Sequence, residues 1–132
     1  MMLRKVLRAK IHRVRVTRTD LDYDGSLTLD EDLMKAADLA PFELVQVYNI
    51  TNGNRFETYI IKGEKDSGEA CINGAAAHLA KINDVIIVAS YALVEEHESI
   101  TPKIVLVDEN NNVKEIKGNT WEKEIFLKNL VI

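Results

Sequence analysis

The chain has 132 residues, of which 46% are hydrophobic and 29% are charged, and its formal net charge is −4. This size and composition predict a single globular domain spanning residues 1–132, because two well-packed cores need a longer chain. The negative net charge argues against nucleic acid and anionic membranes as partners, although seven basic residues crowd the N-terminal end (Arg4, Lys5, Arg8, Lys10, Arg13, Arg15 and Arg18).

The number of cysteines and the hydropathy of the sequence limit the class of protein further. A single cysteine, Cys71, excludes an internal disulfide framework. No run approaches the roughly 18 apolar residues of a membrane span. The opening "MMLRKVLRAKIH" lacks the apolar core and the small-residue cleavage site of a secretory signal. We therefore expect a cytoplasmic protein.

The first predicted element is a strand over residues 11 to 17, "IHRVRVT", because apolar and basic residues alternate strictly. In a regular strand His12, Val14 and Val16 share one face, and Lys10 falls on the same face. An ammonium and an imidazole on an apolar face have two interpretations. They either reach solvent at the rim of a barrel or line a pocket.

Residues 20 to 31, "DLDYDGSLTLDE", match the spacing of an EF-hand calcium loop. The acids fall at loop positions 1, 3, 5 and 12, with a glycine at position 6 (Asp20, Asp22, Asp24, Glu31 and Gly25). An EF-hand also needs an entering helix, whereas the preceding segment has the period of a strand. The alternative is a solvated turn between a strand and a helix, so a calcium-binding module stays open as a competing hypothesis.

The same stretch contains "YDGS", residues 23 to 26, which allows a different chemistry. A glycine tolerates strained φ values and leaves its carbonyl open to attack by the following hydroxyl. Attack of the Ser26 hydroxyl on the Gly25 carbonyl turns the amide into an ester. Elimination then cuts the chain, and hydrolysis leaves a pyruvoyl group, a built-in ketone. The Gly-Ser pair alone is weak support, since such pairs are common in turns.

The remaining elements alternate between short helices and strands. "DEDLMKAADL" predicts a helix that is capped by Asp30 and ends before Pro41. "ELVQVYNITNGNRFETYII" predicts two strands joined at Asn52-Gly53. "CINGAAAHLA" predicts a strand end, a turn and a short helix. "DVIIVASYALV", "PKIVLVD" and "NNNVKEI" predict three more strands.

These elements add up to six or seven short strands with two or three short helices, which predicts a mainly β fold, a small β-barrel. The tail, residues 119–132, carries apolar residues that indicate packing against the body or a neighbouring chain. Cys71 and His78 are interpreted as structural, because nothing in the chain has the spacing of zinc ligands.

Five motifs in order resemble the pyruvoyl-dependent, self-processing aspartate 1-decarboxylase family. They are "KIHRVRVT" (10 to 17), "YDGS" (23 to 26), "YNITNGNRFETY" (48 to 59), "INGAAAH" (72 to 78) and "DVIIVAS" (84 to 90). The resemblance covers about residues 1 to 108. It implies a double-psi β-barrel and a homotetramer with active sites between subunits.

The resemblance also implies a reaction. The chain is expected to be a zymogen that cleaves itself between Gly25 and Ser26 into residues 1–25 (the β chain) and 26–132 (the α chain, with a pyruvoyl N-terminus). The ketone from Ser26 is expected to form a Schiff base with L-aspartate, which yields β-alanine and CO₂ for pantothenate and coenzyme A synthesis. Neither a metal nor pyridoxal phosphate is expected.

Residue roles follow from the same resemblance. Tyr59 is the expected proton donor, and Thr58 is expected to contact substrate and assist self-cleavage. Five residues of the predicted hairpin and turn are expected to bind substrate (Thr58, Asn73, Gly74, Ala75 and Ala76). Tyr23 matches a family position near the cleavage point. Thr58 and Tyr59 point to opposite faces of a simple strand. They serve one chemistry only with a bulge, or when the two faces serve the sites of different subunits.

The dianionic substrate calls for cations. Arg55 is able to grip a carboxylate with two parallel hydrogen bonds, and Lys10 and His12 are able to add positive potential. The competing interpretation of Arg55 is a solvated charge beside the hairpin.

Overall fold

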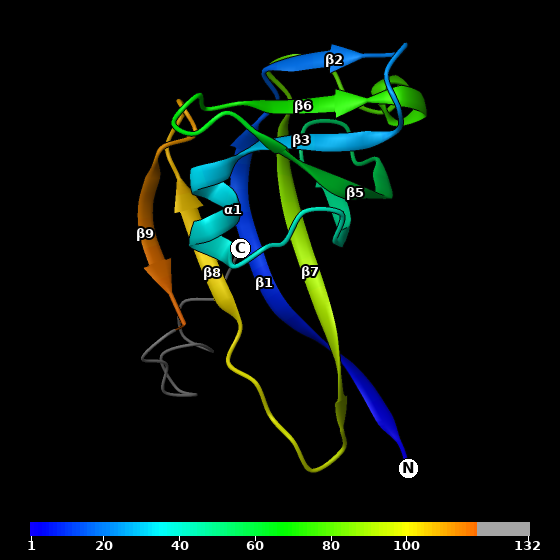
Figure 1. Ribbon diagram of the computed structural model, residues 1–132, viewed down its shortest axis with the longest axis vertical. Helices are drawn as coiled ribbons and strands as arrows, with labels where there is room; N and C mark the ends of the chain where they lie inside the picture. Colours follow the sequence, from blue (N-terminus) through cyan, green and yellow to red (C-terminus); the bar gives the residue numbers. More distant parts are fainter. Residues whose placement is uncertain (119–132) are drawn as a thin grey trace.

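The computed structural model describes residues 1–118 and is dominated by one nine-stranded sheet (Figure 1). The strand order is β2-β6-β3-β5-β4-β7-β1-β8-β9. The elements in chain order are β1 (Leu3–Arg15), β2 (Arg18–Asp20), β3 (Ser26–Asp30), α1 (Glu31–Ala37), β4 (Leu44–Asn49), β5 (Arg55–Gly63), β6 (Ala70–Asn73), the 3-10 helix η1 (Gly74–His78), β7 (Val85–Glu95), β8 (Lys103–Val107) and β9 (Val113–Lys117).

The mainly β class is confirmed, and the predicted count of six or seven strands is wrong. The two extra strands are β2, which ends where the stretch expected to be a solvated turn begins, and β3, which lies within that stretch. β3 pairs in parallel with β5 and antiparallel with β6, and it buries Leu27 and Leu29 completely. Partners this distant in the sequence cannot be read from the local pattern. The predicted tail packing at 119–132 lies outside the described residues.

The core lies between the curved sheet and α1 (Figure 1). The predicted helix is confirmed as α1, which buries Leu33, Met34 and Ala37. Asp30 caps the helix as predicted, and its carboxylate accepts a hydrogen bond from the Asp32 N–H at 2.8 Å. None of the helices described between residues 1 and 118 is long and apolar enough to cross a membrane.

A β-bulge in β1 changes which side chains share a face. Ile11 lies opposite Val88 and Val14 lies opposite Ile86, so β1 carries one residue more than β7 between the two pairs. Arg13 sits at this bulge with a φ of 71°. An extra residue of this kind reverses the alternation of side chains along the strand.

The prediction that Lys10 and His12 share a face with Val14 and Val16 is therefore wrong. Ile11 and the two valines are fully buried in the core, on one face. Lys10 and His12 lie on the opposite face, which we call the outer face of the sheet. The strict alternation of the sequence predicted a regular strand, because a bulge depends on the register with the partner strand and not on the strand's own pattern.

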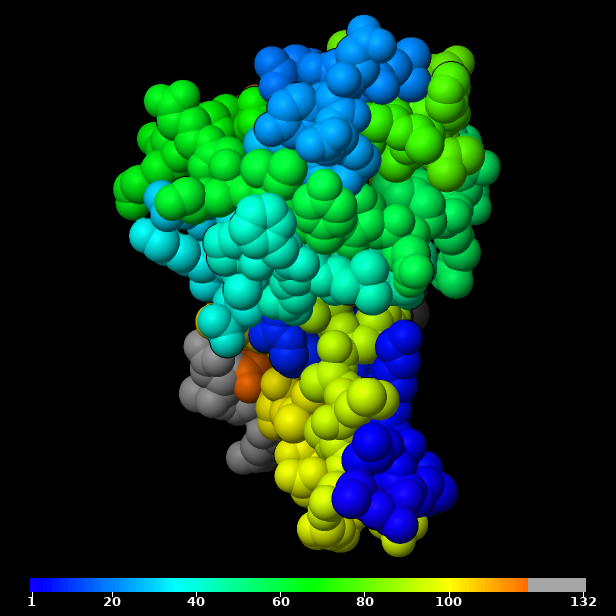
Figure 2. Space-filling view, turned by 45° about the vertical axis from the view of Figure 1, so that its right-hand side comes forward, coloured from blue at the N-terminus to red at the C-terminus, as the bar shows by residue number. Residues whose placement is uncertain are grey.

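The N-terminal half of β1 and the C-terminal half of β7 extend beyond the body as a two-stranded arm. Figure 2 shows it as the narrower lower part of the molecule, where the N-terminus packs beside the residues that follow β7. The arm exposes large apolar side chains, among them Leu3 (49%) and Leu93 (66%). An isolated two-stranded ribbon is marginally stable in water, and soluble monomers rarely expose a large apolar patch.

Candidate active site

Ser26 lies at the start of β3 and is completely buried, while Gly25 just before it is exposed. The Ser26 hydroxyl donates to the Asp24 carbonyl oxygen at 2.9 Å and accepts from the Asn73 side-chain amide at 3.0 Å. The same amide donates to the Thr28 hydroxyl at 2.9 Å. The hydroxyl expected to attack is thus held in one orientation, next to an exposed glycine.

Gly74 opens η1 and packs directly against Gly25. Its φ is 69°, and a Cβ at this position would lie 2.6 Å from the Gly25 Cα and 3.1 Å from the Tyr23 carbonyl oxygen. Only glycine fits here without movement. Gly25 itself has no positive φ, and a Cβ on it would meet nothing within 4 Å. The idea that Gly25 is needed for a strained φ is therefore wrong, and the steric demand lies at Gly74.

The predicted strand end, turn and short helix around Asn73 are confirmed. Asn73 is 2% exposed and faces β3, since it is paired with Ser26 across the antiparallel β3–β6 ladder. Ala75 is exposed and Ala76 packs against the core, so these two alanines do not present their side chains to one point.

Tyr59 and Thr58 lie on opposite faces of β5. Thr58 pairs with buried Val45, whereas Tyr59 pairs with exposed Leu44, and the β4–β5 register runs without a bulge. The parallel β3–β5 ladder begins one residue after Tyr59, at Ile60 opposite Leu27. Tyr59 and Ser26 therefore lie on adjacent strands and on the same outer face, about 4.8 Å apart in strand spacing.

The cationic candidates form a second group farther along the outer face. Arg55 precedes Tyr59 by four residues, about 13 Å along an extended strand. Lys10 pairs with Ala89 on β7, which pairs with Gln46 on β4, so it lies three strand spacings from β5, about 14 Å. Within one protomer, Lys10 and Arg55 therefore lie far from the surroundings of Ser26.

Burial weakens the charged forms of the two β1 candidates. Desolvation lowers the pKa of Lys10. Desolvation also lowers the pKa of His12, and the charges of Lys10 and Arg13 lower it further. His12 is 8% exposed, and its Nδ1 has no hydrogen-bond partner among residues 1–118. A neutral imidazole with a free nitrogen suits hydrogen bonding better than charge attraction.

Two tyrosines join the cationic group, and the sequence analysis missed both. The Arg55 guanidinium carbon lies 4.2 Å from the centre of the Tyr48 ring, a cation–π contact. The Tyr48 and Tyr91 hydroxyls are 2.7 Å apart. Burial and the hydrogen bond to Tyr91 raise the pKa of Tyr48 to about 12. The β4–β5 register pairs Tyr48 with Arg55, and the β4–β7 contact brings in Tyr91.

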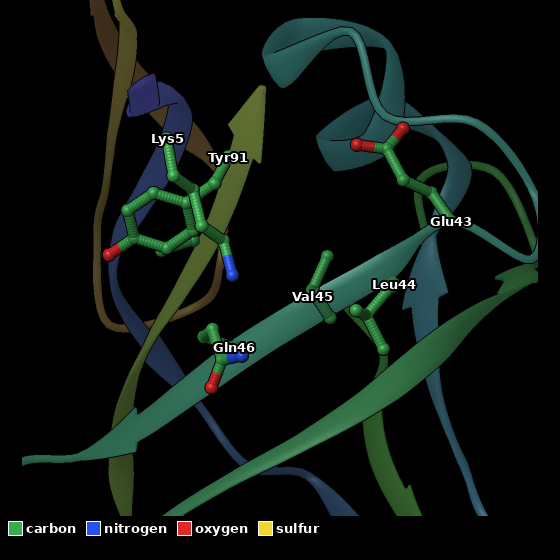
Figure 3. Close-up of a pocket in the computed structure, with 7 residues that line it drawn as sticks. Lys5, Glu43, Leu44, Val45, Gln46 and Tyr91 are labelled. Carbon is green, nitrogen blue, oxygen red and sulfur yellow. The ribbon is translucent and has the colours of Figure 1, made fainter. Parts of the chain in front are cut away.

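A pocket of about 200 Å³ lies between β4 and β7, beside this group. Figure 3 shows Lys5 and Tyr91 on one side of it and Glu43 on the other. Glu43 accepts hydrogen bonds from Arg8 at 2.6 Å and from the Ser90 hydroxyl. Burial alone raises the pKa of Glu43, but bonds from Ser90, a backbone N–H and Arg8 outweigh burial and lower it.

The structure contradicts the hypothesis of an EF-hand calcium site. The twelve-residue stretch is entered from β2 and not from a helix, and its second half is β3, so although α1 follows at Glu31 the stretch is not the loop of an EF-hand. Asp20 accepts from the Asp22 backbone at 3.1 Å, which makes a local turn. Among residues 1–118, no three acidic, histidine or cysteine side chains gather to hold a metal. His78 is exposed and Cys71 fully buried.

Comparison with known proteins identifies the family. The sequence model of the aspartate decarboxylase family matches residues 2–114. The chain belongs to the aspartate decarboxylase family. It is 53% identical to the aspartate 1-decarboxylase of a Sulfurihydrogenibium species over 119 residues. The aligned residues make up 88% of this chain and 89% of the relative.

Two further relatives agree. The aspartate 1-decarboxylase of Cupriavidus taiwanensis is 52% identical over 118 residues, 88% of this chain and 98% of the relative. That of Caldicellulosiruptor saccharolyticus is 50% identical over 125 residues, 93% of this chain and 98% of the relative. The resemblance found in the sequence motifs is confirmed.

Proposed function

We propose that this family member is an aspartate 1-decarboxylase that converts L-aspartate to β-alanine and CO₂, after cleaving its own chain between Gly25 and Ser26. The observation that carries the proposal is the buried Ser26 hydroxyl, held between the Asp24 carbonyl and the Asn73 amide beside an exposed glycine. The family membership supplies the substrate class, and pantothenate and coenzyme A synthesis is the pathway that it implies.

Self-cleavage uses only this chain's own atoms. The Ser26 Oγ forms a bond to the Gly25 carbonyl carbon, the C–N bond breaks, and the hydroxyl proton passes to the nitrogen. Loss of the Ser26 α-proton then expels the Gly25 carboxylate and leaves dehydroalanine. Water hydrolyses its imine tautomer, which releases ammonia and leaves a pyruvoyl group on residues 26–132.

The surroundings of Ser26 fit such a group. Asn73 offers two N–H donors toward the start of β3, and the missing Cβ of Gly74 lets η1 approach the backbone of Gly25 closely. The pyruvoyl group supplies an electrophilic carbonyl and an electron sink for the departing CO₂. No metal and no pyridoxal phosphate enters the proposal.

The chain's own residues bind substrate and move the proton. Arg55, and with it Lys10, attracts the substrate carboxylates, and His12 adds a hydrogen bond. Tyr59 donates the proton that replaces CO₂, consistent with its place on the strand beside Ser26. The backbone of Gly74, Ala75 and Ala76 borders the substrate at the start of η1, and Thr58 assists the cleavage step.

The separation of the two groups supports an active site shared between subunits. Within one protomer, Arg55 lies about 13 Å along β5 from Tyr59, and Lys10 on β1 lies four strand spacings, about 19 Å, from β3. Thr58 and Tyr59 face opposite ways on a regular strand, and of the two only Tyr59 lies on the outer face with Arg55 and Lys10. A second copy that presents its outer face completes each site.

A homotetramer agrees with the apolar arm, which needs a neighbouring chain to cover Leu3 and Leu93. The double-psi β-barrel is the proposed finer description of the fold, and the parallel pairs β1–β8 and β3–β5 within a largely antiparallel sheet support it. The cytoplasmic location and the single domain over residues 1–132 remain predictions from the sequence.

The test combines mass and activity. We expect the denatured purified protein to give two masses that meet at Gly25/Ser26, with the larger fragment lighter by one ammonia than a chain that starts with serine. This preparation releases CO₂ and β-alanine from L-aspartate. Ser26→Ala stays whole and inactive, while the control Asp20→Ala cleaves and decarboxylates as the wild type does. A cleaved Ser26→Ala chain, or a processed wild type that leaves L-aspartate unchanged, contradicts the proposal.

A further inference from the structure

The buried cysteine stands at the end of a hydrogen-bonded chain that leads to the reactive serine. The Cys71 thiol lies 3.1 Å from the Asn73 Oδ1, and the Asn73 Nδ2 lies 3.0 Å from the Ser26 Oγ. All three residues are at most 2% exposed. Cys71 pairs with Thr28 across the β3–β6 ladder, so the cysteine and the threonine flank Asn73 on the same face.

The direction of each hydrogen bond follows from the donors available. The Arg18 Nε lies 3.4 Å from the Cys71 sulfur. A guanidinium only donates, so the sulfur accepts from Arg18 and its own S–H is free to donate to Asn73. The amide oxygen of Asn73 therefore faces Cys71, and its NH₂ group faces the hydroxyls of Ser26 and Thr28.

This orientation matters for the chemistry at Ser26. An N–H donor aimed at the Oγ stabilises the negative charge that develops as the hydroxyl loses its proton. A flipped amide would present its oxygen to Ser26 instead and would oppose deprotonation. The direction of the Asn73 amide is thus a condition for an activated Ser26, and Asn73 by itself has no means of choosing it.

We propose that Cys71 and Thr28 are positioning residues that together lock the Asn73 amide with its NH₂ group on Ser26, and so set the rate of self-cleavage. Cys71 holds the oxygen end through its S–H, and Thr28 holds the nitrogen end by accepting its second N–H. This inference rests on the proposed self-cleavage at Gly25-Ser26. It gives the buried thiol a task in the reaction, beyond filling the core.

The first experiment follows cleavage by mass, starting from freshly purified or freshly refolded protein. We expect Cys71→Ala to slow cleavage about tenfold, the usual effect of losing one buried hydrogen bond. Cys71→Ser keeps a donor at the same place and is expected to cleave within about twofold of the wild type. Thr28→Val keeps the shape, loses the acceptor and is expected to slow cleavage to a similar extent.

The Cys71→Ser variant distinguishes a positioning role of Cys71 from a packing role. Serine is smaller and more polar than cysteine, so a residue needed only for packing would not be restored by it. Equal cleavage rates for Cys71→Ala and the wild type overturn the inference, whatever happens to the melting temperature. A Cys71→Ser variant that cleaves as slowly as Cys71→Ala also overturns it. A wild type that never cleaves overturns the proposed function itself, which is a distinguishable result.

A second measurement needs no cleavage. The chain contains one cysteine, so its S–H stretching band in a Raman spectrum belongs to Cys71 alone. In the uncleaved Ser26→Ala protein we expect this band at the lower frequency of a hydrogen-bonded thiol. Adding Asn73→Ala is expected to move the band to the higher frequency of a free thiol. A band that does not move contradicts the S–H bond to Asn73.

Discussion

Replacing Gly74 by alanine tests the packing that holds the cleavage site. The new Cβ would sit 2.6 Å from the Gly25 Cα and 2.7 Å from its nitrogen, closer than real Cβ contacts. Both neighbours are backbone atoms, so a side-chain rotation cannot relieve the clash. The substitution is therefore expected to push the 23–25 turn away from η1.

The expected cost has two parts. An alanine at a φ of 69° costs roughly 1–2 kcal/mol, and overpacking of a buried site costs roughly 1–3 kcal/mol. The sum, about 2–5 kcal/mol, is a large share of the usual 5–15 kcal/mol of a domain. Gly53 offers a matched control, because its φ is 82° and a Cβ there meets nothing within 4 Å.

The assay is urea unfolding of Gly74→Ala and Gly53→Ala in a Ser26→Ala background, which keeps every chain whole, at one protomer concentration. We expect Gly53→Ala to lose about 1–2 kcal/mol, the backbone part alone, and Gly74→Ala to lose about 1–3 kcal/mol more. With Ser26 restored, only Gly74→Ala is expected to cleave slowly. Equal losses in the two variants would refute the claimed contact between Gly74 and Gly25.

Two further predictions concern carboxylates that accept several hydrogen bonds. Asp30 accepts backbone N–H bonds from Asp32, Asp66 and Gly68, so Asp30→Ala is expected to cost about 2–4 kcal/mol in urea unfolding, and a loss below 1 kcal/mol would contradict it. The pKa of Glu43 is lowered by folding, so its stabilisation is present at neutral pH and is lost as the pH falls from about 4.5 through the folded-state pKa. Glu43→Gln is expected to cost about 1 kcal/mol at pH 7 and progressively less toward pH 3, and a pH-independent difference would contradict this reasoning.

The sequence by itself determined the features that depend on neighbouring residues. Alternation predicted β4 and β5, Asn52-Gly53 predicted the turn between them, and Asp30 predicted the start of α1. These signals are local because turn geometry and capping involve residues only two to five positions apart. The motif order also pointed to the family and to Ser26.

Tertiary structure alone decided which side chains meet. β3 is a strand because β5 and β6 supply its hydrogen bonds from more than 30 residues away. The bulge at Arg13 exists only against β7, and it moves Lys10 and His12 away from the core face. The partner strand sets the phase of the pleat, and the sequence of β1 alone does not encode it.

The surroundings of the reactive serine show the same division. "YDGS" named the bond to be cut, but nothing local linked Ser26 to Asn73. That contact arises from the register of two antiparallel strands, which places residues 47 positions apart opposite each other. The sequence thus determined the reactive group, and strand pairing decided what surrounds it, because hydrogen-bond partners in a sheet are chosen in space.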